Sequence, residues 1–217
     1  MVFVRRKQGE TNMARDTQSI VKMSRREGYA LHPKAHKALA KRSTPPGQAA
    51  NGRFRAKTSQ YSLQLREKQK VKRLYGLLER QFSNLMKEAS RTRGNAGVLL
   101  LQLLEQRADN VVYRSGYAPS RRAARQLVTH GHFMLNGKRF DIPSMRLKPG
   151  DKLEVRAQSQ KTDYFRRLDE TSPAIESLVS WVTADRKKFT ASVKALPVRE
   201  EAEPDLNEQL IVEYYSR

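Results

Sequence analysis

Apolar residues at helical spacing between residues 74 and 104 form the longest part of this chain that can build a buried core. The first run consists of Leu74, Leu77, Leu78, Phe82, Leu85, Met86 and Ala89. Steps of three and four residues place these side chains on one helix face, so we predict helical structure from about residue 61 to residue 93. Gly94 suits the left-handed position beyond a helix end, and Asn95 can cap the next helix. That helix carries the apolar run 98–104, and we expect one helical bundle.

The formal charge of +21 is concentrated toward the N-terminal side of the chain. Residues 1–94 hold 23 Lys or Arg against 6 Asp or Glu, residues 95–156 hold 11 against 5, and residues 157–217 hold 9 against 11. Such an imbalance repels itself unless a polyanion neutralises it, so we expect nucleic acid to be the partner. A membrane surface is the competing polyanion. No run of about 18 apolar residues occurs and the basic segments lack broad apolar faces, so no membrane is expected.

The N-terminal region is predicted to be an extended basic arm. Residues 1–60 are rich in Lys, Arg, Gln, Ser, Pro and Gly and have few periodic apolar positions, so they can bury little core. Composition alone favours a solvated, disordered tail, which RNA would then order. The first ten residues lack the apolar segment and cleavage site of a secretory signal. We therefore expect the protein to stay inside the cell.

A basic helix is predicted from Arg121 to His130, with Ser120 as its N-terminal cap. Residues placed about 100° apart fall into two separate stripes. The apolar stripe is Ala124, Leu127 and Val128, and the basic stripe is Arg121, Arg122 and Arg125. A guanidinium is a planar fork that suits phosphate, so one face is expected to dock on a core and the other to hold RNA backbone. A solvated basic face is the alternative.

A small β-unit is predicted directly after this helix. Asn136-Gly137 separates two short runs and accepts the positive φ that a two-residue type I′ hairpin turn requires. A second turn at residues 148–151 leads into an alternating strand over residues 152–156. The predicted fold class is therefore α+β, with a helical bundle, a basic arm and helices packed on a short antiparallel or mixed sheet.

Several of these motifs together resemble a known RNA-binding family. Residues 107–114 (Arg-Ala-Asp-Asn-Val-Val-Tyr-Arg), residues 120–128, Asn136-Gly137 and Pro149-Gly150-Asp151 are similar to the S-four RNA-binding fold. Residues 65–73, 75–82 and 205–217 are similar to the bacterial ribosomal small-subunit protein four family. The implied organisation is an arm over residues 1–60, a helical rRNA-binding region 61–106 completed by residues 157–217 packing back, and an S-four domain 107–156.

The resemblance implies a structural constituent of the small ribosomal subunit with no enzymatic activity. It implies early binding to the five-way junction in the 5′ domain of 16S rRNA, nucleation of subunit assembly, and a cytoplasmic, ribosomal location. It also implies contact with ribosomal protein five, a place beside the channel through which mRNA enters, and a contribution to translational accuracy. No cofactor, metal or homo-oligomer is expected.

Candidate RNA-binding residues follow from these motifs. Ser24-Arg25-Arg26 resembles the family's N-terminal rRNA contact, and residues 64–73 resemble its basic helix on the junction. The complete set is Ser24, Arg25, Arg26, Arg53, Arg55, Lys57, Gln64, Arg66, Lys68, Lys70, Lys72, Arg73, Arg80, Arg107, Arg114, Arg121, Arg122, Arg125, His130, Asn136 and Lys138. Many Arg and Lys on rigid helices suit RNA, whose helices are recognised by shape, phosphates and 2′-hydroxyls.

The chain departs from the family pattern in two places. Many members carry a zinc-binding cysteine cluster near the N-terminus, but this sequence has no cysteine and offers only His32 and His36 there. A disulfide framework and a thiolate zinc site are thereby excluded. Met13-Ala14-Arg15 resembles the usual family start, which leaves residues 1–12 as a basic extension or places the true start at Met13.

Other functional classes share some of these sequence features. Residues 167–169 (Arg-Leu-Asp) followed by Thr171 resemble the aspartate motif of RNA pseudouridine synthases, which also carry the S-four fold. Those enzymes need a sizeable catalytic domain after the S-four fold, and only 61 residues follow Arg156, so Asp169 is predicted to be a surface carboxylate. A free-standing RNA-binding factor of this fold, or a DNA-packaging protein, would not need the matching arm and tail.

The last segment is predicted to contain a polar helix near residues 158–170, a strand at residues 189–194 and an acidic linker at residues 200–205. Its end, residues 210–215, is apolar and is expected to fold back on the bundle rather than to form a free partner surface. A contact of this region with ribosomal protein five is expected to be of mixed charge.

Overall fold

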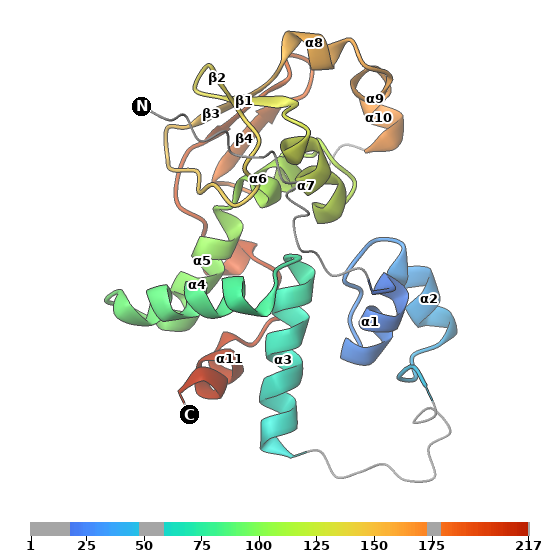
Figure 1. The fold of residues 1–217 in the computed structure, drawn as a ribbon, viewed down its shortest axis with the longest axis vertical. Helices are drawn as coiled ribbons and strands as arrows, with labels where there is room; N and C mark the ends of the chain where they lie inside the picture. Colours follow the sequence, from blue (N-terminus) through green and yellow to red (C-terminus); the bar gives the residue numbers. More distant parts are fainter. Residues whose placement is uncertain (1–17, 48–58, 173–178, 217) are drawn as a thin grey trace, which may run out of the picture.

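The structure is a computed structural model that describes residues 18–47, 59–172 and 179–216. Two units lie one above the other, with the helix α5 between them (Figure 1). The helical unit contains α1 (Ile20–Glu27), α2 (Ala35–Lys41), α3 (Gln60–Leu74), α4 (Glu79–Arg91), α5 (Ala96–Glu105) and α11 (Glu208–Tyr215). The predicted α+β class is confirmed.

The α/β unit is built on a five-stranded sheet in which every neighbouring pair is antiparallel, in the order β2-β1-β3-β5-β4. Its elements are α6 (Ala108–Arg114), α7 (Arg121–Thr129), β1 (Phe133–Leu135), β2 (Lys138–Phe140), β3 (Lys152–Val155), α8 (Ala157–Gln160), α9 (Asp163–Arg166), α10 (Leu168–Thr171), β4 (Val182–Asp185) and β5 (Thr190–Val193). A short 3-10 helix, η2 (Arg199–Glu201), leads to α11.

The helical prediction over residues 61–93 needs one correction, because the chain turns between α3 and α4. Gly76 has φ of +66°, a left-handed conformation that L side chains rarely adopt, so a continuous helix ends there. The turn lets Leu74 and Phe82, both buried, enter one core with Leu100 and Ile211. Asn95 caps α5 as predicted, since its Oδ1 accepts from the amide of Gly97 at 2.9 Å.

The hairpin prediction is confirmed. Asn136 and Gly137 have φ of +50° and +79°, the two positive values that a type I′ turn needs. Phe133 pairs with Phe140 across the hairpin and with Val155 on β3. All three side chains are buried in the core that the sheet shares with α6 and α7.

The described residues from 157 onward divide between the two units, whereas the organisation implied by the sequence assigned this whole segment to the bundle. The strands β4 and β5 complete the sheet, and Trp181 is 1% exposed in the sheet's core. The expected single polar helix is three short helices, α8 to α10, because the chain turns to bury Phe165 and Leu168. Only the part from about Arg199 onward lies against the bundle, where Ile211 of α11 is buried.

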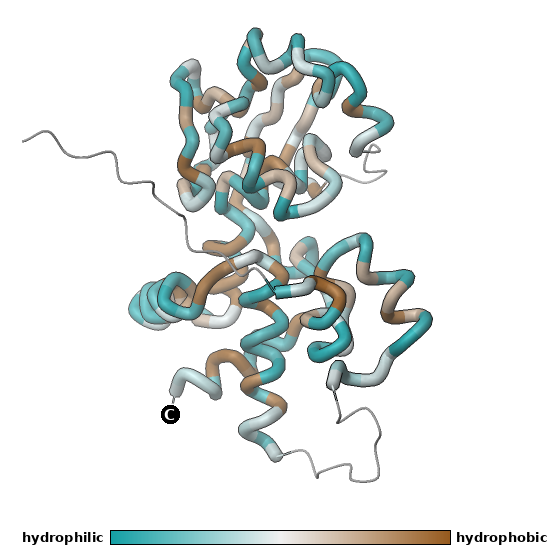
Figure 2. The backbone as a smooth tube through the Cα atoms, turned by 45° about the vertical axis from the view of Figure 1, so that its right-hand side comes forward, coloured by the Kyte–Doolittle hydropathy of each residue, from teal (hydrophilic) through white to brown (hydrophobic). Residues whose placement is uncertain are grey.

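Hydrophobic stretches gather where the elements of each unit face one another, while much of α3 is hydrophilic (Figure 2). In the described ranges, no helix has both the length and the apolar character needed to span a membrane. The hydrophilic character of α3 makes the partners of its charged side chains important for function.

Candidate RNA-binding surface

The helix α7 is built as its sequence predicts. Ser120 caps it, its Oγ accepting a hydrogen bond from the amide of Ala123 at 3.3 Å. Ala124, Leu127 and Val128 are buried against the sheet. The apolar stripe of α7 therefore packs on the core of the α/β unit, as predicted. The contacts of its arginines decide whether its basic stripe faces solvent.

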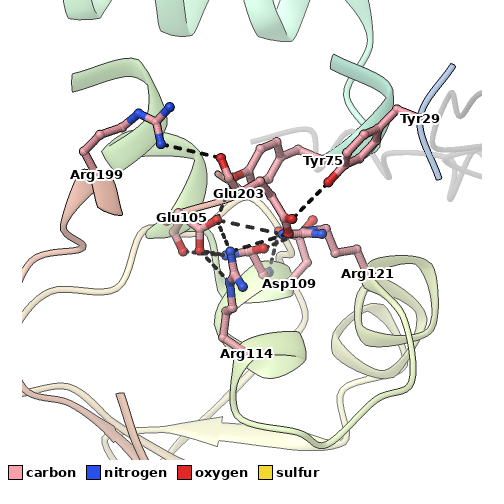
Figure 3. A network of polar contacts seen from close by, with 9 residues as sticks. Tyr29, Tyr75, Glu105, Asp109, Arg114, Arg121, Arg199 and Glu203 are labelled. Carbon is pink, nitrogen blue, oxygen red and sulfur yellow. Dashed lines mark hydrogen bonds and ion pairs between the residues drawn. The ribbon is translucent and has the colours of Figure 1, made fainter. Parts of the chain in front are cut away.

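Arg121 does not face outward with the other arginines of α7. Its Nε donates to Oδ1 of Asn110 and its Nη2 donates to Oε1 of Glu203, each at 2.8 Å (Figure 3). The guanidinium carbon lies 4.8 Å and 4.7 Å from the ring centres of Tyr75 and Tyr113, respectively. The side chain is only 13% exposed. Its donors and its flat face are thus used within the protein.

This placement corrects the expected three-arginine face of α7. On the helix, Arg121 stands at the border between the apolar and basic stripes, so a carboxylate from elsewhere in the chain can draw it inward. Arg122 is exposed, and Arg125 is half-buried, donating from Nη1 to the carbonyl oxygen of Gly76 at 3.0 Å. Burial lowers the pKa of Arg125, with Arg107 as a smaller contribution, against the opposing charge of Asp109.

Glu105 is the centre of the polar contacts around Arg121. Its carboxylate, 1% exposed, accepts from the hydroxyl of Tyr75 at 2.6 Å, from Nδ2 of Asn110 at 2.7 Å and from Arg114 at 2.9 Å and 3.0 Å. Burial by itself would raise the pKa of Glu105, but the charge and hydrogen bonds of Arg114, the charge of Arg121 and the hydrogen bond from Tyr75 together hold the pKa below the ordinary value. The carboxylate therefore stays ionised inside the fold.

Glu203 brings two further segments into this cluster. Its Oε1 lies 3.6 Å from Arg114, and its Oε2 accepts from the hydroxyl of Tyr29 at 3.2 Å (Figure 3). We call the set the interdomain network, and its members are Tyr29, Tyr75, Glu105, Asn110, Arg114, Arg121 and Glu203. They come from the loop after α1, the α3–α4 turn, α5, α6, α7 and the segment before α11. The network therefore ties the N-terminal helices, the bundle and the α/β unit together.

The basic run of α3 is largely neutralised inside the protein. Arg66 and Arg73 both pair with Oε1 of Glu27, whose side chain is fully buried, the first at 3.2 Å. Burial raises the pKa of Glu27 against the opposing charges of these two arginines. Lys70 pairs with Glu67 at 3.3 Å and also donates to the carbonyl oxygen of residue 205. These contacts hold α1 and the C-terminal segment on α3.

A second carboxylate takes the remaining lysines of α3. Glu79 accepts from Lys68 at 2.8 Å, from Lys72 at 3.0 Å and from the hydroxyl of Tyr215 at 3.0 Å. Although burial opposes the shift, these hydrogen bonds lower the pKa of Glu79 to about 2. The ammonium of Lys68 also lies 4.3 Å from the ring centre of Tyr214. Lys68 and Lys72 of α3 thus bind α3 to α4, and Lys68 also contacts α11.

Six predicted RNA-contacting side chains lie inside the fold or are almost covered: Ser24, Gln64, Lys68, Arg107, Arg114 and Arg121. Ser24 donates to the carbonyl oxygen of Ile20 at 2.8 Å, and Arg107 forms a two-point pair with Asp109 at 3.0 Å and 3.1 Å. Each has at least one hydrogen-bond partner within the protein, although Oε1 of Gln64 is buried without one among the described residues. This corrects the expectation that they face RNA, because a buried donor that already has a partner gains little from phosphate.

Seven predicted residues remain at the surface or close to it: Arg25, Arg26, Arg80, Arg122, His130, Asn136 and Lys138. Arg25 is held by the carbonyl oxygen of Thr44, to which its Nε donates at 3.0 Å. Asn136 links its turn to the start of β3, since its Oδ1 accepts from the amide of Lys152 at 2.9 Å. Arg53, Arg55 and Lys57 lie outside the described residues.

Several exposed cations that sequence reasoning did not select stand on three helices of the bundle and their flanks. They are Lys22 on α1, Lys34, Lys37, Lys41 and Arg42 on and around α2, and Lys87 and Arg91 on α4. Helical positions 80, 84, 87 and 91 share one face of α4, so the spacing in the sequence already places Lys87 and Arg91 beside the selected Arg80. The family motif points to α3 instead, so these two residues are absent from the predicted set.

The two histidines considered for zinc do not form a site. Nδ1 of His32 accepts from the amide of Lys34 at 3.1 Å, and His36 is exposed. Burial, followed by the charges of Arg122 and Lys34, lowers the pKa of His32. Across the part of the chain that the structure describes, no three metal-ligating His, Cys, Asp or Glu side chains come together.

Asp169, the aspartate of the decoy enzyme motif, lies on the surface of α10. Its side chain is 92% exposed and makes an ion pair at 3.3 Å with Arg186. A carboxylate in open solvent has no shaped pocket to orient it toward a substrate. The position agrees with the surface role predicted for it.

A helical bundle with exposed cations, joined to a helix-and-hairpin unit on an antiparallel sheet, defines a class of RNA-binding proteins with an S4 domain. Residues 15–105 match the family described as "Ribosomal protein S4/S9 N-terminal domain" and residues 106–153 match the family described as "S4 domain".

Curated relatives extend the likeness over nearly the whole chain. "Small ribosomal subunit protein uS4" of Herpetosiphon aurantiacus is 50% identical over 211 residues, and the same-named protein of Chlorobaculum tepidum is 49% identical over 206 residues. That of Syntrophomonas wolfei is 46% identical over 211 residues. Each comparison covers 94% of this chain and 100% of the relative. The chain belongs to the family of small ribosomal subunit protein uS4, whose members are structural ribosomal proteins rather than enzymes.

Proposed function

We propose that this chain is a structural constituent of the small ribosomal subunit that binds 16S rRNA through cations on the outside of both units. The observation that carries the proposal is the division of its charges. The buried arginines and lysines hold the protein together, while another set, including Arg26, Arg80 and Lys138, remains on the surface. Because phosphate contacts supply most of the affinity for a nucleic acid, the surface set is the candidate RNA grip.

The proposed target is the five-way junction of the 5′ domain, bound early so that it nucleates subunit assembly. Two features support a junction rather than a single helix. Basic residues occur on both units, and the interdomain network fixes one unit against the other. A rigid protein with charge on several faces recognises the arrangement of RNA helices, which is recognition by shape.

We further propose contact with ribosomal protein five near the free ends of α3 and α11, with a contribution to translational accuracy. Tyr61 and Leu63 are 48% and 45% exposed there, and the ring of Tyr61 lies 5.8 Å from that of Tyr214. Exposed apolar and aromatic side chains that cluster together favour a protein partner. Glu213 of α11 and the lysines of α3 give the region the mixed charge expected for that contact. We also propose a position beside the mRNA channel. The predicted extended arm over residues 1–60 needs a correction in its described part, because this part contains α1 and α2 and buries Met23 and Leu31 in the bundle core.

Binding to a transcript of the 5′ domain tests the proposal. The full chain should bind the transcript tighter than one with a disrupted five-way junction, by about tenfold or more. In cell extracts, it should co-sediment with the small subunit through salt washing. Equal affinity for both transcripts, together with free protein at the top of the gradient, would favour a free-standing RNA-binding factor instead.

A further inference from the structure

The carboxylates of α4 pair with cations of other elements, whereas the cations of α4 itself stay exposed. Its acidic residues are Glu79, which holds two lysines of α3, and Glu88, which forms a two-point pair at 2.5 Å and 2.6 Å with Arg146 of the α/β unit. The guanidinium of Arg146 is the largest cause that holds the pKa of Glu88 below its ordinary value. Neither carboxylate is left to neutralise the cations of α4.

Those cations are aligned on the outer side of the helix. Arg80, Asn84, Lys87 and Arg91, which we call the α4 stripe, follow one another at steps of four, three and four residues, so they share one face. All four are exposed, and an open surface hollow is lined by Asn84, Lys87, Glu88 and Arg91. Within the described residues, no side-chain hydrogen bond or ion pair engages the three cations. At about 1.5 Å rise per residue, the stripe is about 16 Å long.

The contrast with α3 identifies which helix is available to RNA. Each cation of α3 that was predicted to contact the junction, from Arg66 to Arg73, has a carboxylate partner in the protein. Part of the donor capacity and charge of each is thereby used within the protein. The cations of the α4 stripe give up only water, and Asn84 adds an amide donor between them.

We propose that the α4 stripe is a phosphate-contacting surface for RNA, and that it takes the place in the bundle that sequence motifs assign to α3. The ligand is the sugar–phosphate backbone of the same RNA, so the inference rests on the proposed function and deepens it. Figure 1 shows α4 projecting sideways from the top of α3 below the α/β unit, so an RNA helix along it can reach both units. Arg146 of the α/β unit, which pairs with Glu88, lies where that unit contacts α4.

A triple substitution with a charge-matched control tests the stripe. Arg80→Gln, Lys87→Gln and Arg91→Gln together remove three exposed cations, and Lys161→Gln, Lys187→Gln and Lys194→Gln remove three exposed cations of the α/β unit. The salt dependence of binding to the 5′-domain transcript is measured for both. The stripe variant should lose about 2 to 3 from the slope of log K against log salt and bind about 10- to 100-fold more weakly near 0.15 M salt. The control should stay within about threefold of the unmodified chain.

Site-directed cleavage gives an independent readout, because the chain has no cysteine of its own. An iron–EDTA group attached to Asn84→Cys should cleave the bound transcript at defined positions, with Lys187→Cys as the second attachment site. Equal losses in the two triples, or absence of cleavage from position 84 in a complex with the usual affinity, would overturn the stripe. Failure of the unmodified chain to bind the transcript would instead refute the proposed function.

Discussion

At the residue scale, the chain separates arginines and lysines that build the protein from those that are available to RNA. The two kinds are alike in sequence. Arg121 and Arg122 are neighbours on one helix, yet Arg121 is held by Glu203, which lies 82 residues further along the chain. A wheel of α7 places both on a basic stripe because it contains no information about a carboxylate in another segment. The identity of the helix, its cap and its apolar face could be predicted, but the partner of Arg121 could not.

The buried carboxylate of Glu105 gives a pH prediction at this scale. Its folded pKa is lower than that of an unfolded glutamate, near 4.5, so its stabilisation is complete above about pH 4.5 and is lost as pH falls through the folded-state value. Glu105→Gln should lower the free energy of unfolding at pH 7 by roughly 3 kcal/mol, since breaking a buried pair leaves charges uncompensated. The difference from the unmodified protein should shrink as pH drops below about 4.5.

Denaturant unfolding at several pH values measures that difference. Lys138→Gln, which changes an exposed residue without an ion pair among the described residues, is the matched control and should stay within about 0.5 kcal/mol throughout. A difference for Glu105→Gln that is constant from pH 7 to pH 3 would contradict the ionised state assigned to this carboxylate.

At the element scale, the local signals predicted the elements better than their assembly. The hairpin turn at Asn136-Gly137 and the helix cap at Asn95 depend on the side chains and backbone preferences of those residues alone, so both could be predicted. The break at Gly76 was missed because Leu74, Leu77 and Leu78 keep helical spacing across it. The strand β4 was not predicted, and the strand predicted at residues 189–194, which is β5, was assigned to the wrong unit, because strand pairing over long separations leaves no periodic trace in the sequence.

Close packing between α5 and α11 gives a prediction for an element contact. A Cβ added at Gly97 would lie 2.7 Å from Cγ and 2.9 Å from Cβ of Glu208, which is held in place by Arg199 at 3.0 Å. Gly97→Ala should therefore lower the free energy of unfolding by about 1 to 3 kcal/mol despite the better helix propensity of alanine. Ser90→Ala, at an exposed position of α4, controls for helix propensity, and thermal unfolding checks both. An increase in stability for Gly97→Ala would show that α11 is more loosely docked than described.

At the scale of the whole molecule, two basic units are held at a fixed orientation by a buried network, and their outer faces carry the charge. The network uses residues that resemble RNA contacts in the sequence, so part of the +21 charge is structural. Recognition of an RNA junction by shape depends on that fixed orientation. The interdomain network therefore contributes to binding by positioning the two units, without contacting phosphate.

The salt dependence of binding for Arg121→Met tests this central claim most directly. Methionine keeps an apolar stem between the two tyrosines but removes the guanidinium that joins Asn110 to Glu203. The variant should bind the 5′-domain transcript more weakly, by about tenfold or more, while the slope of log K against log salt stays within about 0.3 of the unmodified chain. A slope shallower by about 1, as expected for one lost phosphate contact, would contradict the account.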